Sequence, residues 1–208
     1  MSDPTRTAIL DAAEAAFKLE PFTKVSVSSV ADSAHASIGA IYHHFGDKEG
    51  LRAAVTERIM ERLVEGHLRP SFLLEETTPT ERLVAGTLAY VRFTEEFYDD
   101  FALLSSTQHD VRESEHAQKY SRGTIRYVTS IMGLAIDVVR EGQANGEVRR
   151  GEPGGMVVLV WSALYGMCTL VRRYPGPVRG ATGQSSTSDL AVRLIYAALS
   201  PDAQPAPA

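Results

Sequence analysis

Polar and basic side chains between Ser37 and Lys48 have types and spacings that suit phosphate binding. The hydroxyl of Tyr42 lies beyond an apolar ring and can reach a phosphate oxygen. Lys48 follows Asp47, a residue that can cap a new helix, so its ammonium group would lie beside free backbone N–H groups. His43 and His44 are adjacent and point in different directions around a helix, so they do not converge on one metal ion. The alternatives are a half-buried core position for Tyr42 and a solvated surface position for Lys48.

Two short helices are expected to position these side chains. Ser26 and Ser37 each precede apolar residues at helical spacing, which makes each serine a favourable N-cap. Residues 34–36 between the two segments leave room only for a tight turn. Two helices joined in this way form a helix-turn-helix, whose second helix can enter a major groove. Gly39 has no side chain and would allow close approach to DNA.

The same stretch resembles the DNA-reading core of the TetR family of repressors. The resemblance covers about residues 9–55, and its specific part is the ordered run S-x-G-x-I-Y-H-H-F-x-x-K. The residues that carry it are Ala31, Ser37, Gly39, Ile41, Tyr42, His43, His44, Phe45, Lys48 and Leu51. Pro21 and His35 stand where the family usually has glycine, and Ala36 replaces the usual valine. These departures leave the angle between the two short helices open.

The resemblance implies an all-α protein with an N-terminal helix-turn-helix DNA-binding unit and a larger helical ligand-binding and dimerisation domain. It also implies a homodimer that represses transcription from a double-stranded DNA operator with two half-sites. A small-molecule effector entering the larger domain would release it. The DNA-binding residues are expected to be Ser26, Ser37, Ile38, Gly39, Ala40, Tyr42, His43 and Lys48. Of these, Tyr42 and Lys48 would contact phosphates, while Ser37, Ile38, Gly39, Ala40 and His43 would lie nearest the bases.

Charge limits how such a unit can bind DNA. The formal net charge is −5, and residues 1–56 contain five basic and seven acidic side chains. Local placement matters more than the total, so this does not exclude DNA binding. It does predict few phosphate ion pairs per subunit, so that tight binding would depend on two subunits acting together.

The remaining chain shows helical patterns separated by proline- and glycine-containing breaks. We expect a DNA-binding domain over 1–50, a helical ligand-binding and dimerisation domain over 51–200, and a disordered tail over 201–208. Pro175 to Ser188 is expected to be a loop. The strongly apolar segment from Met156 to Val171 and the helix that starts at Asp189 have apolar faces suited to a two-fold dimer interface.

Aromatic residues on several helices of the larger domain predict a ligand cavity with a few polar anchors. The candidates are Phe93, Phe97, Phe101, Gln108, His109, Arg112, Arg126, Tyr127, Trp161 and Tyr165. The effector would be mostly apolar, with an acidic group to meet Arg112 or Arg126. The alternative is that these aromatic residues pack as ordinary core.

Other function classes find little support. The sequence lacks the common nucleophile, phosphate-loop and dinucleotide motifs, so no enzymatic activity, catalytic residue or cofactor is expected. His109, Glu113 and His116 share one helical face, but solvated charges are favoured there over a metal. No apolar run is expected to span a membrane, and the polar start and single Cys168 favour the cytoplasm. The remaining alternative is a helical scaffold or sensor that no longer binds DNA.

Overall fold

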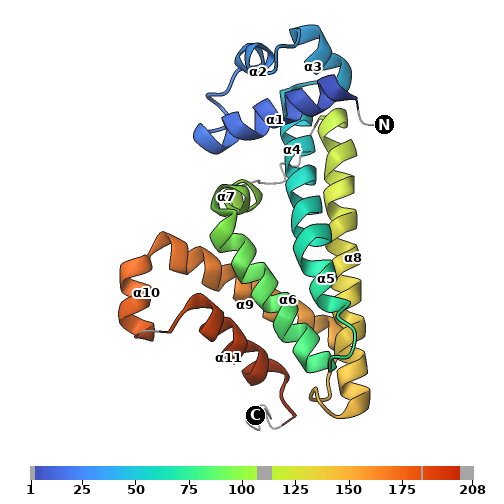
Figure 1. Cartoon of the computed structure of the whole chain (residues 1–208), viewed down its shortest axis with the longest axis vertical. Helices are drawn as coiled ribbons and strands as arrows, with labels where there is room; N and C mark the ends of the chain where they lie inside the picture. Colours follow the sequence, from blue (N-terminus) through green and yellow to red (C-terminus); the bar gives the residue numbers. More distant parts are fainter. Residues whose placement is uncertain (1–2, 107–113, 184, 202–208) are drawn as a thin grey trace. The chain divides into compact units, whose positions relative to one another are not determined.

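The computed structural model describes residues 3–106, 114–183 and 185–201, and these contain helices and no strand (Figure 1). The predicted all-α fold is therefore confirmed. In chain order the elements are α1 (Pro4–Leu19), α2 (Val27–Ser33), α3 (Ile38–Phe45), α4 (Lys48–Leu63), the π-helical turn η1 (Val64–Leu68), α5 (Arg69–Phe72), α6 (Pro79–Glu96), α7 (Tyr98–Ser106), α8 (Glu115–Asn145), α9 (Pro153–Arg173), α10 (Pro175–Thr182) and α11 (Thr187–Leu199).

The helices divide into two compact units. Unit 1 contains residues 1–62 and 98–128, and unit 2 contains residues 63–97 and 129–208. The helix-turn-helix therefore belongs to a larger unit than the predicted 1–50 segment, because α4, α7 and the first half of α8 pack against it. Those long-range contacts have no signature in the local sequence.

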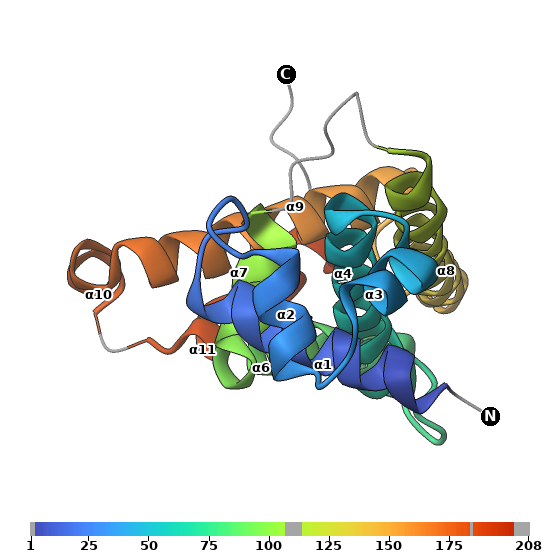
Figure 2. The same cartoon turned by 90° about the horizontal axis from the view of Figure 1, so that it is seen from above.

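Helices α1, α2 and α3 of unit 1 lie together (Figure 2), and a side-chain cap starts each of them. Asp3 caps α1, with Pro4 at the first helical position. The Ser26 hydroxyl accepts a hydrogen bond from the Ser29 N–H at 3.0 Å, and the Ser37 hydroxyl accepts one from the Ala40 N–H at 3.0 Å. Each cap satisfies a backbone donor that the helix itself leaves unpaired. Both predicted serine caps are confirmed.

A cluster of five charged residues joins α1, α4 and α7 within unit 1. This ionic cluster consists of Glu14, Lys18, Arg58, Arg62 and Asp100. Glu14 accepts from Arg58 at 2.5 Å and from Arg62 at 3.0 Å, and Arg62 also donates to Asp100 at 2.7 Å. Asp100 is only 1% exposed, and Lys18 forms ion pairs with both acids. Because the charges are paired across three helices, the cluster fixes α7 against α1 and α4.

Unit 2 is built around α6, with α5 and α11 packed against it and α9 packed on α11 and α6. A capping box starts α6, since the Thr78 hydroxyl accepts from the Glu81 N–H and the Glu81 carboxylate accepts from the Thr78 N–H. The expected loop from Pro175 to Ser188 is wrong in its first half, where α10 forms. None of the side chains of α10 is buried. Its prolines and glycines gave a loop-like composition, which hid the helix.

Helix α9 is long and apolar enough to cross a membrane by length and composition alone. This corrects the expectation that no segment reaches that limit. Only 22% of the apolar 18-residue stretch of α9 is buried within the structure. A single helix of this kind is weak evidence for a membrane span.

The ionic cluster predicts a pH-dependent loss of stability in Glu14→Gln. Burial raises the pKa of Glu14, but hydrogen bonds from Lys18 and Arg62 and the charge of Arg58 outweigh it and hold that pKa at about 2. Since this lies below the ordinary value of 4.5, the stabilisation is present above pH 4.5 and is lost as the pH falls toward 2. Urea unfolding at fixed protomer concentration should show Glu14→Gln less stable by about 3 kcal/mol at pH 7. The difference should shrink markedly at pH 3.

The matched control is Glu20→Gln, which neutralises an exposed acid at the end of the same helix. It should change the free energy of unfolding little at either pH. A deficit in Glu14→Gln that is equal at pH 7 and pH 3 would show that the charge of Glu14 is not the source of the stabilisation.

Candidate functional site

Helix α3 has one buried face and one exposed face. Ile41 and Phe45 are buried in unit 1, whereas Ile38 and Tyr42 are 45% and 50% exposed. Gly39 and His43 are also exposed, and Ala40 is half-buried. A short helix with an exposed face of small, apolar and hydrogen-bonding side chains has the form needed to read a groove.

The turn before α3 is closed by a residue in a left-handed conformation. His35 has φ of +50°, which few residues other than glycine adopt. The Ala36 N–H donates to the Ala31 carbonyl at 3.0 Å across this turn. The turn thus keeps the conformation expected of glycine even though histidine occupies the position.

Lys48 begins α4, where Asp47 provides the cap. The Asp47 carboxylate accepts from the Gly50 N–H at 2.6 Å. The Lys48 ammonium lies 4.4 Å from the centre of the Phe22 ring, and the Arg52 guanidinium lies 4.8 Å from the same ring. A cation over an aromatic face has a restricted position. Phe22 therefore holds two positive charges near the first turn of α4.

The predicted DNA-binding residues all lie in unit 1, at the starts of α2 and α4 and along α3. Ser26 and Ser37 are exposed caps, and Lys48 is half-buried. The residues that sequence reasoning missed here are Phe22 and Arg52. An aromatic residue between two helices gave no sign that two cations would stack on it.

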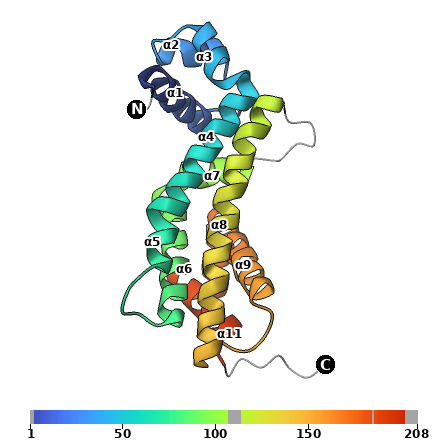
Figure 3. The same ribbon diagram turned by 90° about the vertical axis from the view of Figure 1, so that its right-hand side faces the viewer.

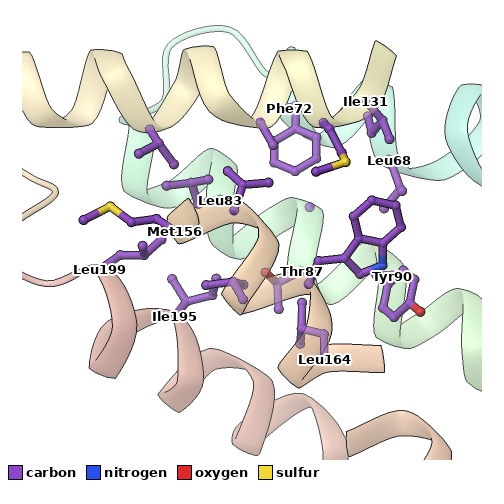
Figure 4. Close-up of a pocket in the computed structure, with 17 residues that line it drawn as sticks. Leu68, Phe72, Leu83, Thr87, Tyr90, Ile131, Met156, Leu164, Ile195 and Leu199 are labelled. Atoms are coloured by element: carbon purple, nitrogen blue, oxygen red, sulfur yellow. The ribbon is translucent and has the colours of Figure 1, made fainter. Parts of the chain in front are cut away.

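A separate apolar cavity of about 90 Å³ lies in unit 2 (Figure 4). Helices α6, α8, α9 and α11 line it, together with residues from η1 and α5. The lining consists of Leu68, Phe72, Leu83, Gly86, Thr87, Tyr90, Ile131, Met132, Ala135, Val139, Met156, Val157, Val160, Trp161, Leu164, Ile195 and Leu199. It contains no acidic or basic side chain.

Three lining residues carry polar groups, namely Thr87, Tyr90 and Trp161. The Tyr90 phenol is hydrogen-bonded to Trp161, and burial raises the pKa of Tyr90, so the phenol stays neutral at physiological pH. Gly86 is required beside Phe72, because a Cβ on Gly86 would lie 2.5 Å from the end of the Phe72 ring. These features leave an uncharged space.

The predicted ligand residues are scattered. Trp161 lines the cavity, whereas Phe93 and Phe97 stack on each other and contact His67 edge to face in unit 2. Phe101 is buried in unit 1, and Tyr127 is half-buried in the part of α8 that belongs to unit 1. Tyr165 is 40% exposed on α9. Gln108, His109 and Arg112 lie outside the described residues.

Arg126 does not lie at this cavity. It is in unit 1, its side chain is 81% exposed, and its nearest acid is Glu57 at 4.0 Å. The basic anchor expected for an acidic group of the effector therefore has no counterpart in the cavity wall. Sequence reasoning missed most lining residues because apolar positions at helical spacing look the same whether they face a cavity or a filled core.

Comparisons with known proteins agree with this geometry. The model of the tetR family of bacterial regulatory proteins matches residues 9–55. The transcriptional regulator UidR of Escherichia coli (strain K12) is 36% identical over 69 residues, which are 33% of this chain and 35% of UidR. The match thus spans about a third of the length of this curated relative.

Solved structures share the fold over nearly the whole chain. SmeT, described as the repressor of the Stenotrophomonas maltophilia multidrug efflux pump SmeDEF, has a TM-score of 0.70 at 20% identity, covering 96% of this chain and 94% of SmeT. The TetR-family regulator PfmR of Thermus thermophilus has a TM-score of 0.64 at 22% identity, covering 92% of this chain and 96% of PfmR. Residues 9–55 are thus similar to the helix-turn-helix region of the tetR family of bacterial regulatory proteins, and the chain shares the fold of these solved structures.

Proposed function

We propose that this protein is a ligand-responsive transcriptional repressor that binds a DNA operator as a cytoplasmic homodimer. The observation that carries the proposal is the two-faced α3. Its buried Ile41 and Phe45 anchor it, while Ile38, Tyr42 and His43 face solvent. The name of SmeT as a repressor supports the direction of regulation.

Base reading by α3 would depend on shape and apolar contacts. The helix has no arginine, so the bidentate recognition of guanine is not available to it. Ile38 and Ala40 can contact thymine methyl groups, and Tyr42 can bind a phosphate. Because few cations support each subunit, two subunits on two half-sites would supply the affinity.

Selection from a random pool of DNA duplexes tests the proposal directly. The purified protein should enrich duplexes with a two-fold symmetric site and should bind them more tightly than unrelated duplexes of equal length. Failure to enrich any sequence would favour the alternative of a helical scaffold that no longer binds DNA.

Lys48→Ala should weaken binding to all duplexes alike. If Lys48 contacts a phosphate, its loss removes one released counterion, so the slope of log K against log salt should become shallower by about one per subunit. Ala40→Ser should instead change which duplexes are selected. Fluorescence anisotropy over a salt series measures both effects.

Arg150→Ala, which removes an exposed cation from unit 2, is the control and should leave the slope unchanged. Wild-type affinity and slope in Lys48→Ala would show that Lys48 is a surface cation with no phosphate contact.

The unit 2 cavity supports a neutral, apolar effector. Its wall offers only a hydroxyl, a phenol and an indole as polar groups, so a charged ligand would lose its hydration without a partner. At about 90 Å³ the cavity is smaller than typical ligand pockets of about 300–1,000 Å³. A larger effector must therefore displace side chains, and Met132 and Met156 are flexible enough to move. Differential binding worth about 1–3 kcal/mol would release DNA measurably.

Ala135→Leu should block effector binding by filling this cavity from α8. In a thermal-shift panel, neutral apolar compounds should raise the melting temperature of the wild type, while their carboxylate analogues should not. Ala135→Leu should show no such rise in melting temperature and should keep the DNA affinity of the wild type.

The matched control is Ala144→Leu, at an exposed position on the same helix. It should respond to compounds as the wild type does. Equal shifts in wild type and Ala135→Leu would place the effector elsewhere.

A two-fold dimer through α9 and α11 would explain the exposed apolar face of α9. Only one stripe of α9 is buried, formed by Met156, Val160, Leu164 and Cys168. The apolar residues Val158, Leu159 and Leu170 remain exposed. An apolar helix face of this kind is a typical subunit interface.

Leu159→Asp should therefore convert the dimer to a monomer, because it places a charge in the apolar contact. Sedimentation velocity at micromolar protomer concentration measures the change. Leu19→Asp, at a leucine that is 84% exposed on α1, is the control and should remain dimeric. A wild type that is monomeric under these conditions would reject the dimer.

A further inference from the structure

We infer that the N-terminal turns of α8 hold the DNA-reading helix α3 in its binding orientation, with Tyr120 and His116 as positioning residues. The inference rests on the proposed DNA-binding function. It extends that function to side chains that are distant in sequence and need not touch DNA. Figure 3 shows the first turns of α8 beside the turn that joins α3 to α4, and the contacts between them lie within unit 1.

Tyr120 satisfies an unpaired backbone group at the end of α3. The last carbonyls of a helix have no partner within the helix. The Tyr120 hydroxyl donates to the His44 carbonyl at 3.1 Å, and the Tyr120 ring lies 6.2 Å from the ring of Phe45. Tyr120 is itself buried, so its hydroxyl has a fixed position. One side chain of α8 thus bonds and packs against the last two residues of α3.

His116 fills the space above the turn between α3 and α4. A Cβ on Gly46 would lie 2.0 Å from Cγ of His116, and a Cβ on Gly50 would lie 3.1 Å from Cβ of His116. Gly46 also has φ of +79°, so glycine is favoured there by conformation as well as by space. The α3–α4 turn therefore approaches α8 closely enough for the imidazole to fill the position of a side chain.

These contacts are on the side of α3 that faces the protein. His44 is half-buried and its imidazole lies 3.4 Å from the Asp3 carboxylate, while Tyr42 and His43 remain exposed. DNA and α8 therefore do not compete for the same atoms. Fixing α3 before DNA arrives removes an ordering cost that binding would otherwise have to supply.

The test is Tyr120→Phe, which keeps the ring and removes the hydrogen bond. Affinity for the duplex that the wild type selects should fall about two- to tenfold per subunit, the range for one lost hydrogen bond. Affinity for unrelated duplexes and the salt slope should stay unchanged, because no phosphate contact is lost. Titration at high DNA concentration gives the active fraction, which separates misfolding from weaker binding.

Hydrogen exchange provides a readout that needs no DNA. In Tyr120→Phe the amides of α3 should exchange several-fold faster, while those of α2 should not change. His116→Ala should likewise lower the affinity for the selected duplex and speed the exchange of the α3 amides. Tyr174→Phe, which removes an exposed phenol from unit 2, is the control and should match the wild type.

The inference is overturned if Tyr120→Phe binds the selected duplex with wild-type affinity and the amides of α3 exchange at the wild-type rate. An equal loss of affinity for selected and unrelated duplexes would overturn it as well. A wild type that prefers no duplex would overturn the proposed function and this inference together. The wild-type selection therefore distinguishes the two failures.

Discussion

The burial of Ile41 and Phe45 is the constraint on which the proposed DNA-reading surface of α3 depends. Both side chains are almost fully buried, and each stabilises unit 1 by about 1.5–3 kcal/mol. Because α3 spans only eight residues, anchoring these two side chains determines the direction of every other side chain on it. Tyr42 and His43 are exposed because they lie outside the face of the helix that Ile41 and Phe45 form. The composition of the outer face can then vary with the DNA sequence while the inner face stays the same.

A second constraint is electrostatic and extends the unit beyond its helix-turn-helix. Asp100 is almost fully buried on α7, where its charge requires partners, and Arg62 and Lys18 provide them from α4 and α1. Breaking such a set leaves an uncompensated charge, which costs more than the intact pairs contribute. The cluster therefore favours one arrangement of the three helices over others with similar apolar contacts. Whatever changes the position of α7 must also act on α1 and α4 of unit 1.

The sequence predicted what local chemistry determines. Ser26, Ser37 and Asp47 were recognisable as caps because each bonds to a backbone N–H three residues away. The contacts that join α7 and α8 to α1, α3 and α4 could not be predicted from the sequence. They connect residues at least 38 positions apart in the chain, and no local pattern marks the partner. Helix α10 was missed for the opposite reason, since its local composition opposes a helix that forms nevertheless.

The two candidate sites, the exposed face of α3 and the cavity in unit 2, also differ in how far the sequence could predict them. Most residues of the proposed DNA-reading surface lie on one short helix, α3, so their spacing in the sequence could specify them. The cavity is assembled from helices far apart in the chain, and its residues are apolar like those of any core. The sequence analysis assigned polar residues as anchors for a ligand. Arg126 instead lies in solvent, where hydration stabilises its charge more than an apolar cavity wall could. The chemistry of an apolar cavity is defined by which groups it excludes. That property appears only when the positions of all its walls are known.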